Sequence, residues 1–314
     1  MKQSANEMLN AAGIYRDAPP NSHEFAGRFP DGARYRIEIP SVEGPRSLEA
    51  VLAAARRWEV PVTRVSQGSG SSMLTDTEIL EMVDMASESG VEISLFVRPN
   101  AGWDISAASR APSGGAFAAS TWGAGQLTFA VNELSRVAEL GVRSVLIGDV
   151  GLLMVLGRLR TAGILPATFQ AKTSVMLPAC NTAAALLYAE LGANTINVAP
   201  DLGVIDLAAL RSAVTVPLDV YIEAPDDLGG FVRYHDLVEI VRVAAPVYVK
   251  LGLRNAPSVY PSGGHLDSTM INLGIERVRR ARLALDILAR GGVTDYPSQP
   301  GAEGLAIPVP RSQP

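Results

Sequence analysis

Cysteine and histidine are scarce in this chain. Its 314 residues contain one cysteine, Cys180, and three histidines. A single cysteine excludes an internal disulfide framework and, within one chain, a cysteine-ligated zinc or iron–sulfur site. Three histidines leave little for a histidine-rich metal site. We therefore expect no iron–sulfur cluster.

An excess of positive charge and a long apolar run are also missing. The chain has 27 Lys and Arg against 32 Asp and Glu, a net charge of −5 with no basic block. Phosphate contacts need clustered Lys and Arg, so we expect no nucleic-acid partner. The most apolar later stretch, 142–159, contains three charged residues and is too polar for a membrane span of roughly 20 residues. The first residues lack the apolar core of a signal peptide, so we expect no membrane partner and a cytoplasmic location.

What the sequence does contain is a regular alternation of strand-like and helix-like segments, which is typical of parallel βα units. The strands expected are 33–42, 62–66, 92–98, 144–149, 168–174, 195–198, 218–223 and 247–251. The helices expected after them begin near residues 47, 76, 125, 151, 181, 205, 236 and 267. Eight strands, each followed by a helix, predict an α/β protein that closes into a (β/α)8 TIM-like barrel. The first strand leads into Glu-Gly-Pro, not the glycine-rich turn of a doubly wound sheet.

We expect a single domain. The barrel covers 33–291, between an N-terminal extension, 1–32, and a Pro/Gly-rich tail, 292–314. The Gly/Ala/Ser-rich stretch 101–124 predicts a long loop after the third strand, and loops of this length are usually lids or disordered. The tail has five prolines and little periodicity, which is typical of an extended arm or a disordered end. Such an arm could wrap around a second copy, so we expect a homo-oligomer.

Polar residues end the predicted strands, where the chemistry of this fold is found. They are Glu38, Arg64, Arg98, Asp149, Lys172, Asn197, Glu223 and Lys250. Burying a charge costs several kcal/mol unless it is paired or solvated. The ring therefore predicts a polar pocket for a small-molecule substrate at the barrel mouth. The alternative is a network of salt bridges that plugs the barrel.

Lys172 and Lys250 allow two interpretations each. A lysine on a central strand loses hydration, which lowers its pKa and favours the neutral amine. A neutral amine supports Schiff-base formation with a carbonyl substrate. The alternative is a fixed cation that binds a carboxylate.

Carboxylates gather after the seventh strand, where Glu223 precedes Asp226 and Asp227. Together with Asp149, Glu223 could hold a divalent metal such as Mg²⁺ through oxygen ligands. Alternatively, Glu223 is a general acid or base and the two aspartates form a turn.

Two Gly/Ser-rich loops, 66–72 and 261–266, expose backbone N–H groups that could cradle an anion or simply form turns. Cys180 follows the fifth strand and could face the mouth or be a buried, inert thiol. The residues predicted to bind substrate are Arg64, Gln67, Arg98, Asn197, Lys250, Arg254 and His265.

Five segments of the second half carry a family likeness: GVRSVLIGD, AKTSVMLPACN, LGANTINVAPDLG, PLDVYIEAPDDLGGFVR and APVYVKLGLRNAP. Through them, residues 141–290 resemble the peptidase U32 family, also called collagenase-like proteases. The resemblance implies a TIM-like barrel and a peptide-like substrate, and it carries over only Asn197 and Glu223, as mouth residues. Family members that act in hydroxylation have clustered cysteines for an iron–sulfur centre, so that activity is not expected with Cys180 alone.

These observations predict a barrel enzyme that acts on a small anionic or peptide-like substrate, with Lys172, Glu223 and Asp149 as catalytic residues. The resemblance suggests hydrolysis. The charged mouth suggests a lysine-dependent or Mg²⁺-dependent lyase, aldolase or isomerase instead. The remaining alternative is a barrel that binds a ligand without catalysis.

Overall fold

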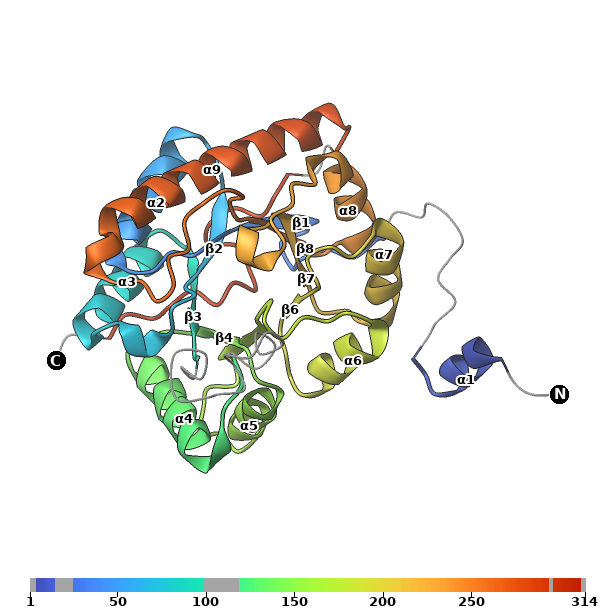
Figure 1. The fold of residues 1–314 in the computed structure, drawn as a ribbon, viewed down its shortest axis with the longest axis horizontal. Coiled ribbons are helices and arrows are strands. Elements are labelled where there is room, and N and C mark those ends of the chain that lie inside the picture. The colour runs from blue at the N-terminus through green and yellow to red at the C-terminus, as the bar shows by residue number, and fades with distance from the viewer. Residues whose placement is uncertain (1–3, 15–24, 99–118, 294–295, 312–314) are drawn as a thin grey trace.

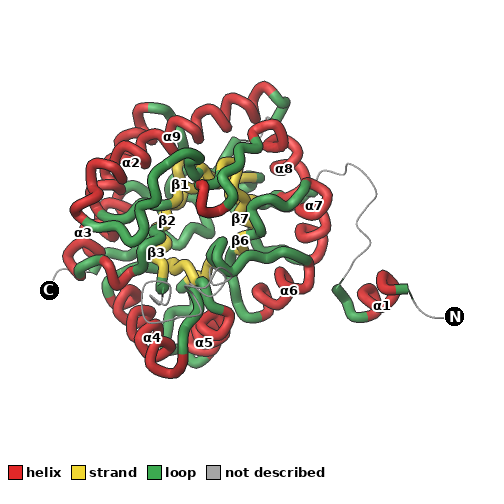
Figure 2. Tube along the Cα trace, in the orientation of Figure 1, coloured by secondary structure: helices red, strands yellow, loops and turns green. Residues whose placement is uncertain are grey.

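The computed structural model describes residues 4–14, 25–98, 119–293 and 296–311, and in it eight parallel strands form a ring enclosed by helices (Figures 1 and 2). The strands are β1 (Tyr35–Pro40), β2 (Val62–Ser66), β3 (Glu92–Phe96), β4 (Ser144–Ile147), β5 (Gln170–Thr173), β6 (Ile196–Asn197), β7 (Leu218–Glu223) and β8 (Val247–Leu251). They pair in the order β5-β4-β3-β2-β1-β8-β7-β6, and a bridge from Lys172 to Thr195 joins β5 to the start of β6. The predicted (β/α)8 barrel is confirmed.

The helices are α1 (Ala5–Ala11), α2 (Pro45–Arg57), α3 (Asp76–Glu88), α4 (Gly123–Glu139), α5 (Val150–Thr161), α6 (Thr182–Glu190), α7 (Val204–Ala213), α8 (Leu237–Ala244) and α9 (Asp267–Arg290). Each of α2 to α9 follows a strand, as predicted. Helix α1 lies in the expected extension and buries no residue. The loop predicted over 101–124 lies mostly outside the described residues. In the described part of the chain, no helix is long and apolar enough to cross a membrane.

The two faces of the strands have opposite character. Residues such as Ile37, Val65 and Val249 point outward and pack under the helices in one continuous apolar core. The alternate residues Glu38 and Arg64 point inward, where side chains from different strands contact one another. Successive strand side chains face opposite sides, so one strand builds both layers. The polar strand residues therefore lie inside the barrel.

Five predicted strands, the first and the third to sixth, are longer than the observed ones, and at two of them the difference moves a predicted site residue out of the strand. β4 stops at Ile147, and Asp149 instead caps α5, because its Oδ1 accepts the N–H of Leu152 at 2.7 Å. An N-cap carboxylate satisfies one of the free N–H groups of the first helical turn. β3 stops at Phe96, which places Arg98 in the loop beyond the strand.

The tail crosses the N-terminal end of the barrel, where the strands begin. Its backbone N–H groups bond to three successive parts of the barrel: Ser298 to Tyr35 O at 3.1 Å, Gly301 to Gly90 O at 2.7 Å and Val309 to Gly141 O at 2.9 Å. A Cβ at Gly141 would lie 2.2 Å from Val309 O, so the close approach requires glycine there. The extended tail is confirmed for 296–311, but it packs on its own barrel, and the homo-oligomer stays a prediction without support from it.

Candidate active site

Four charged side chains from four strands meet inside the barrel: Glu38, Arg64, Lys172 and Asp219. All four are at least 99% buried. The Arg64 Nε donates to Glu38 Oε2 at 2.8 Å, and its Nη2 reaches Asp219 Oδ1. The Lys172 Nζ contacts both oxygens of Glu38 and lies 3.4 Å from Asp219 Oδ2. These contacts connect opposite sides of the barrel.

Lys250 adds a third cation to this cluster. Its Nζ donates to Asn197 Oδ1 at 2.8 Å, lies 3.6 Å from Glu38 Oε1 and sits 4.2 Å from the ring centre of Tyr221. The Asn197 amide in turn donates to the backbone carbonyl of Thr173. Asn197 and Lys250, both predicted to bind substrate, are therefore brought together, and Asn197 holds the ammonium group in place.

Burial and the charges in this cluster shift the pKa values of Glu38 and Lys172. Burial opposes ionisation of Glu38, but the surrounding Arg64, Lys172 and Lys250 hold its pKa well below its usual range. Burial, helped by the cations Arg64 and Lys250, lowers the pKa of Lys172 to about 7, although Asp219 and Glu38 act in the opposite direction. Lys172 is therefore a mixture of amine and ammonium at neutral pH.

Arg64 is saturated by its framework. Besides the two carboxylates, its Nη1 donates to Thr195 Oγ1 at 3.2 Å, and its guanidinium lies 3.4 Å from the ring centre of Tyr248. The nearby carboxylates raise its pKa, although burial opposes this. Contact with substrate, as predicted for Arg64, would require these bonds to break, so the structure uses it to hold Glu38 and Asp219.

The loop after β2 is held by its own side chains. The Gln67 amide bonds to both the N–H and the carbonyl of Gly70, at 3.1 and 2.8 Å. Gln67 thus shapes the loop, and its polar atoms are already engaged. Arg98 is 9% exposed and its Nη1 donates to Gly68 O at 3.4 Å. Burial lowers the pKa of Arg98, but a guanidinium remains charged.

Glu223 is buried at the end of β7. Its Oε2 accepts from Tyr234 Oη at 3.0 Å and its Oε1 accepts from the backbone N–H of Arg254 at 3.0 Å. The Arg280 Nε of α9 lies 3.8 Å away. By contrast, the side chains of Arg254 and His265 are exposed. Glu223 therefore fixes the loop that carries Arg254.

The predicted metal pair is not assembled as expected. Both oxygens of Asp149 accept backbone N–H groups, from Leu152 at 2.7 Å and from Thr121 at 3.0 Å. Strand β4, which precedes Asp149, and strand β7, which ends at Glu223, are three positions apart around the ring. Among the described residues, no group of three or more His, Cys, Asp or Glu side chains could hold a metal ion. The Mg²⁺ site stays a prediction.

Two further expectations at the mouth are resolved. Asp226 and Asp227 lie in a 3₁₀ turn, and the Oδ2 of Asp226 accepts from the N–H of Asn255 at 2.5 Å, so the turn interpretation is confirmed. Cys180 is exposed, so the prediction of a buried thiol is wrong.

The sequence missed four residues that the fold brings to this region. Asp219 stands near the start of β7, so a search of strand ends overlooks it. Glu43 and Tyr260 lie in connecting segments, and Arg277 lies on α9 among other arginines. The polar residues Ser41 and Glu43, directly after β1, were the feature of the sequence that could have pointed to Glu43.

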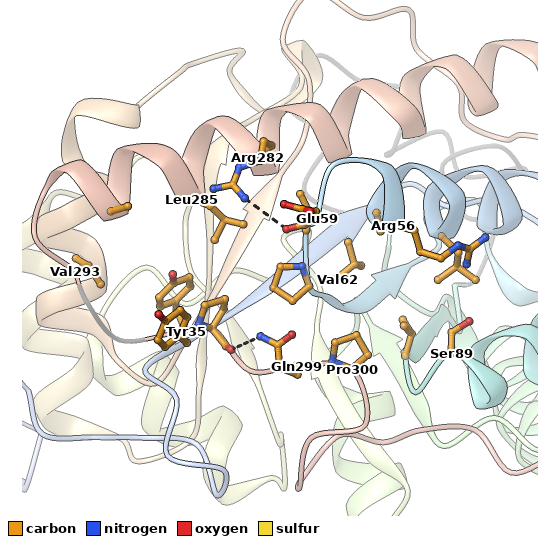
Figure 3. A pocket seen from close by; sticks show the side chains of 18 of the residues that line it. Tyr35, Arg56, Glu59, Val62, Ser89, Arg282, Leu285, Val293, Gln299 and Pro300 are labelled. Carbon is orange, nitrogen blue, oxygen red and sulfur yellow. Dashed lines mark hydrogen bonds between the residues drawn. The ribbon is translucent and has the colours of Figure 1, made fainter.

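A pocket of about 920 Å³ lies at the other end of the barrel, between α2, α9 and the tail (Figure 3). Tyr35, Arg56, Glu59, Arg282 and Gln299 line it, and Arg282 reaches the backbone carbonyl of Glu59 at 3.5 Å. None of the predicted site residues lines this pocket. It is therefore separate from the charged cluster.

The fold and these contacts define a (β/α)8 barrel with a charged interior. No family model matches the sequence, and no curated protein matches it. Solved structures that are similar include a U32 peptidase, at 16% identity and a TM-score of 0.41 over 67% of this chain and 74% of that chain. A truncated 3-deoxy-D-arabino-heptulosonate 7-phosphate synthase from Thermotoga maritima is similar at 14% identity and 0.44, over 81% and 88%. Likeness at this level leaves the family open and says nothing of function.

Proposed function

We propose that the protein is a barrel enzyme that binds a small anionic carbonyl compound at the mouth and uses Lys172 as its reactive amine. The observation that carries this proposal is the position of the Lys172 Nζ, between the carboxylates of Glu38 and Asp219 and beside two more cations. A lysine that is desolvated next to other cations loses its proton easily and becomes a nucleophile. The pKa of about 7 gives it that character near neutral pH.

The chemistry follows from the amine. Neutral Lys172 adds to the carbonyl carbon to form a carbinolamine, whose hydroxyl group takes a proton from solvent and leaves as water, which gives a protonated Schiff base. The positive nitrogen then accepts the electron pair from a neighbouring carbon–carbon or carbon–hydrogen bond as that bond breaks, and the proton released in that step passes to solvent. Glu38 and Asp219 are placed to stabilise the positive nitrogen, since both already contact it. Lysis, aldol cleavage or isomerisation all use this intermediate.

Peptide hydrolysis, suggested by the resemblance to U32 peptidases, has less support. A serine, threonine or cysteine nucleophile in a peptidase is activated by an adjacent base such as a histidine. Within the described residues, neither His235 nor His265 bonds to a hydroxyl or thiol, and the Cys180 Sγ contacts only Pro178 O, at 3.7 Å. Amine chemistry is therefore the better proposal.

Trapping with borohydride tests the proposal. The protein is incubated with a panel of small 2-keto acids and phosphorylated aldehydes, reduced, and weighed intact by mass spectrometry. We expect a stable adduct with one compound class, mapped to Lys172 by peptide analysis and absent from Lys172→Met. Lys250→Met is the matched lysine variant, and it should keep an adduct at Lys172.

An adduct on Lys250 in place of Lys172 would contradict the assignment of the amine. Binding of a compound without any adduct would contradict the proposal that the protein is a Schiff-base enzyme, and it would favour a barrel that binds a ligand without catalysis.

A further inference from the structure

Arg277 is an unusual arginine on α9. Its neighbours Arg279, Arg280 and Arg282 bond to carboxylates on the same helix, Glu276 and Asp286, with a third or so of each side chain exposed. Arg277 is 4% exposed and has no carboxylate within 4.0 Å in the described part of the chain. It is therefore a buried cation without an ion pair.

Its hydrogen bonds are also incomplete. A guanidinium has five N–H donors. Among the residues that the structure describes, Arg277 makes one hydrogen bond, a long one of 3.4 Å from Nη1 to the carbonyl of Ser41, and its buried Nε has no hydrogen-bond partner. An unsatisfied buried donor on a charged group is unfavourable, and a bound ion or other ligand is one of the partners that can satisfy it. The Ser41 carbonyl directly follows β1, so the guanidinium reaches the mouth.

The charges around Arg277 favour an anion. Burial lowers the pKa of Arg277 and the charge of Glu43 opposes this effect, and that carboxylate already accepts the N–H groups of Gly68 and Ser69 at 2.8 and 2.9 Å. Arg98 acts on the same Glu43 and on the same Tyr260 as Arg277 does. Both guanidiniums therefore face the same carboxylate.

We propose that Arg277, together with Arg98, forms an oxyanion subsite above β1 and β8 that binds the carboxylate or phosphate end of the substrate. The subsite rests on the proposed function for its role but not for its existence. Arg277 also acts on Tyr221, whose ring holds the Lys250 ammonium. An anion on Arg277 is thus one side chain away from the lysine cluster, which suits a compound of a few carbon atoms with a carbonyl group at its other end.

Anion binding by the unreacted protein tests the subsite. Inorganic phosphate and oxalate are titrated separately by calorimetry at low ionic strength into the wild type, Arg277→Met and Arg279→Gln. We expect at least one anion to bind, Arg277→Met to weaken it by about 10- to 100-fold, and the matched variant Arg279→Gln to bind like the wild type. Binding of phosphate alone assigns a phosphate end, and binding of oxalate alone assigns a carboxylate end.

Thermal unfolding without anion provides a second readout. Because Arg277 has few bonds to lose, Arg277→Met should unfold at a temperature no lower than the wild type, whereas a structural arginine would lower it. The subsite is overturned if neither anion binds the wild type, or if Arg277→Met binds as tightly. Lys172→Met should still bind the anion. Failure to trap a carbonyl compound would therefore remove the proposed function and leave the subsite in place.

Discussion

Arg36 and Arg277 are buried to nearly the same extent, at the two ends of one barrel, and their surroundings differ completely. Arg36, at the end covered by the tail, donates to Ser298 Oγ, Tyr248 Oη and Glu303 O at 2.9, 3.1 and 2.6 Å, and stacks on Phe29. Arg277, at the mouth, makes one long hydrogen bond. The comparison teaches that the tail supplies Arg36 with acceptors of a kind that Arg277 lacks at the mouth, among the described residues. In the proposed subsite, the bound anion supplies them to Arg277.

The largest expected effect is a loss of stability when Arg36, at the end of the barrel covered by the tail, is replaced. Arg36→Met removes three hydrogen bonds from a charged donor and leaves the buried hydroxyls of Ser298 and Tyr248 without it, so we expect a loss of about 3 kcal/mol or more in the free energy of unfolding. Urea denaturation measures it, and Arg277→Met run alongside should lose far less. Equal losses in the two variants would contradict the difference between the two ends.

The second prediction concerns Lys172, midway between the ends. Its pKa is about 7 in the folded protein and 10.5 in its ordinary state. Between these values the unfolded chain holds a proton that the folded chain has released, so stability rises with pH. That contribution is complete above pH 10.5 and is lost as the pH falls through 7.

Denaturation at pH 7 and pH 9.5 should show a rise of about 3 kcal/mol in the wild type, below the range in which buried tyrosines ionise. Lys172→Met should lack this rise. The same rise in both proteins would mean that another group causes it.

A smaller effect is expected at the rim. Asp149→Ala removes the cap of α5, which should cost about 1 kcal/mol of stability. The yield of the borohydride adduct should stay near that of the wild type, since both Asp149 oxygens are engaged by the backbone. Abolished adduct formation in a folded Asp149→Ala protein would restore the catalytic role predicted from the sequence.

The smallest expected effect is a change in anion affinity at the mouth of the barrel. Burial raises the pKa of Glu43, which faces Arg277 and Arg98. Glu43→Gln removes a negative charge while its single oxygen can still accept one of the two loop N–H groups, so phosphate should bind a few-fold more tightly. In the wild type, the binding of oxalate, which stays a dianion over this pH range, should tighten as the pH falls and Glu43 takes up a proton. Calorimetry at pH 5.5 and 7.5 on both proteins checks this, and weaker binding by Glu43→Gln would count against the subsite.

The alternation along the chain was enough to predict the barrel, because each strand is apolar outward and each helix follows at a regular interval. It also predicted that Glu38, Lys172, Asn197 and Lys250 converge, since inward residues of parallel strands share one interior. The alternation did not predict contacts between side chains that depend on how the helices and loops pack against the barrel. Arg277 reads as one more surface arginine in a helix, and Asp149 reads as a strand end until the helix after it uses the carboxylate as a cap.

The state of the Lys172 amine tests the central claim most directly. Carbon-13 formaldehyde with cyanoborohydride methylates amines through a Schiff base, and the resulting methyl resonances report each pKa by NMR. We predict a resonance that is absent from Lys172→Met and titrates near pH 7, well below those of exposed lysines. A Lys172 that takes no methyl group, or that titrates near 10.5, would contradict the account and leave the charged barrel interior as a structural network.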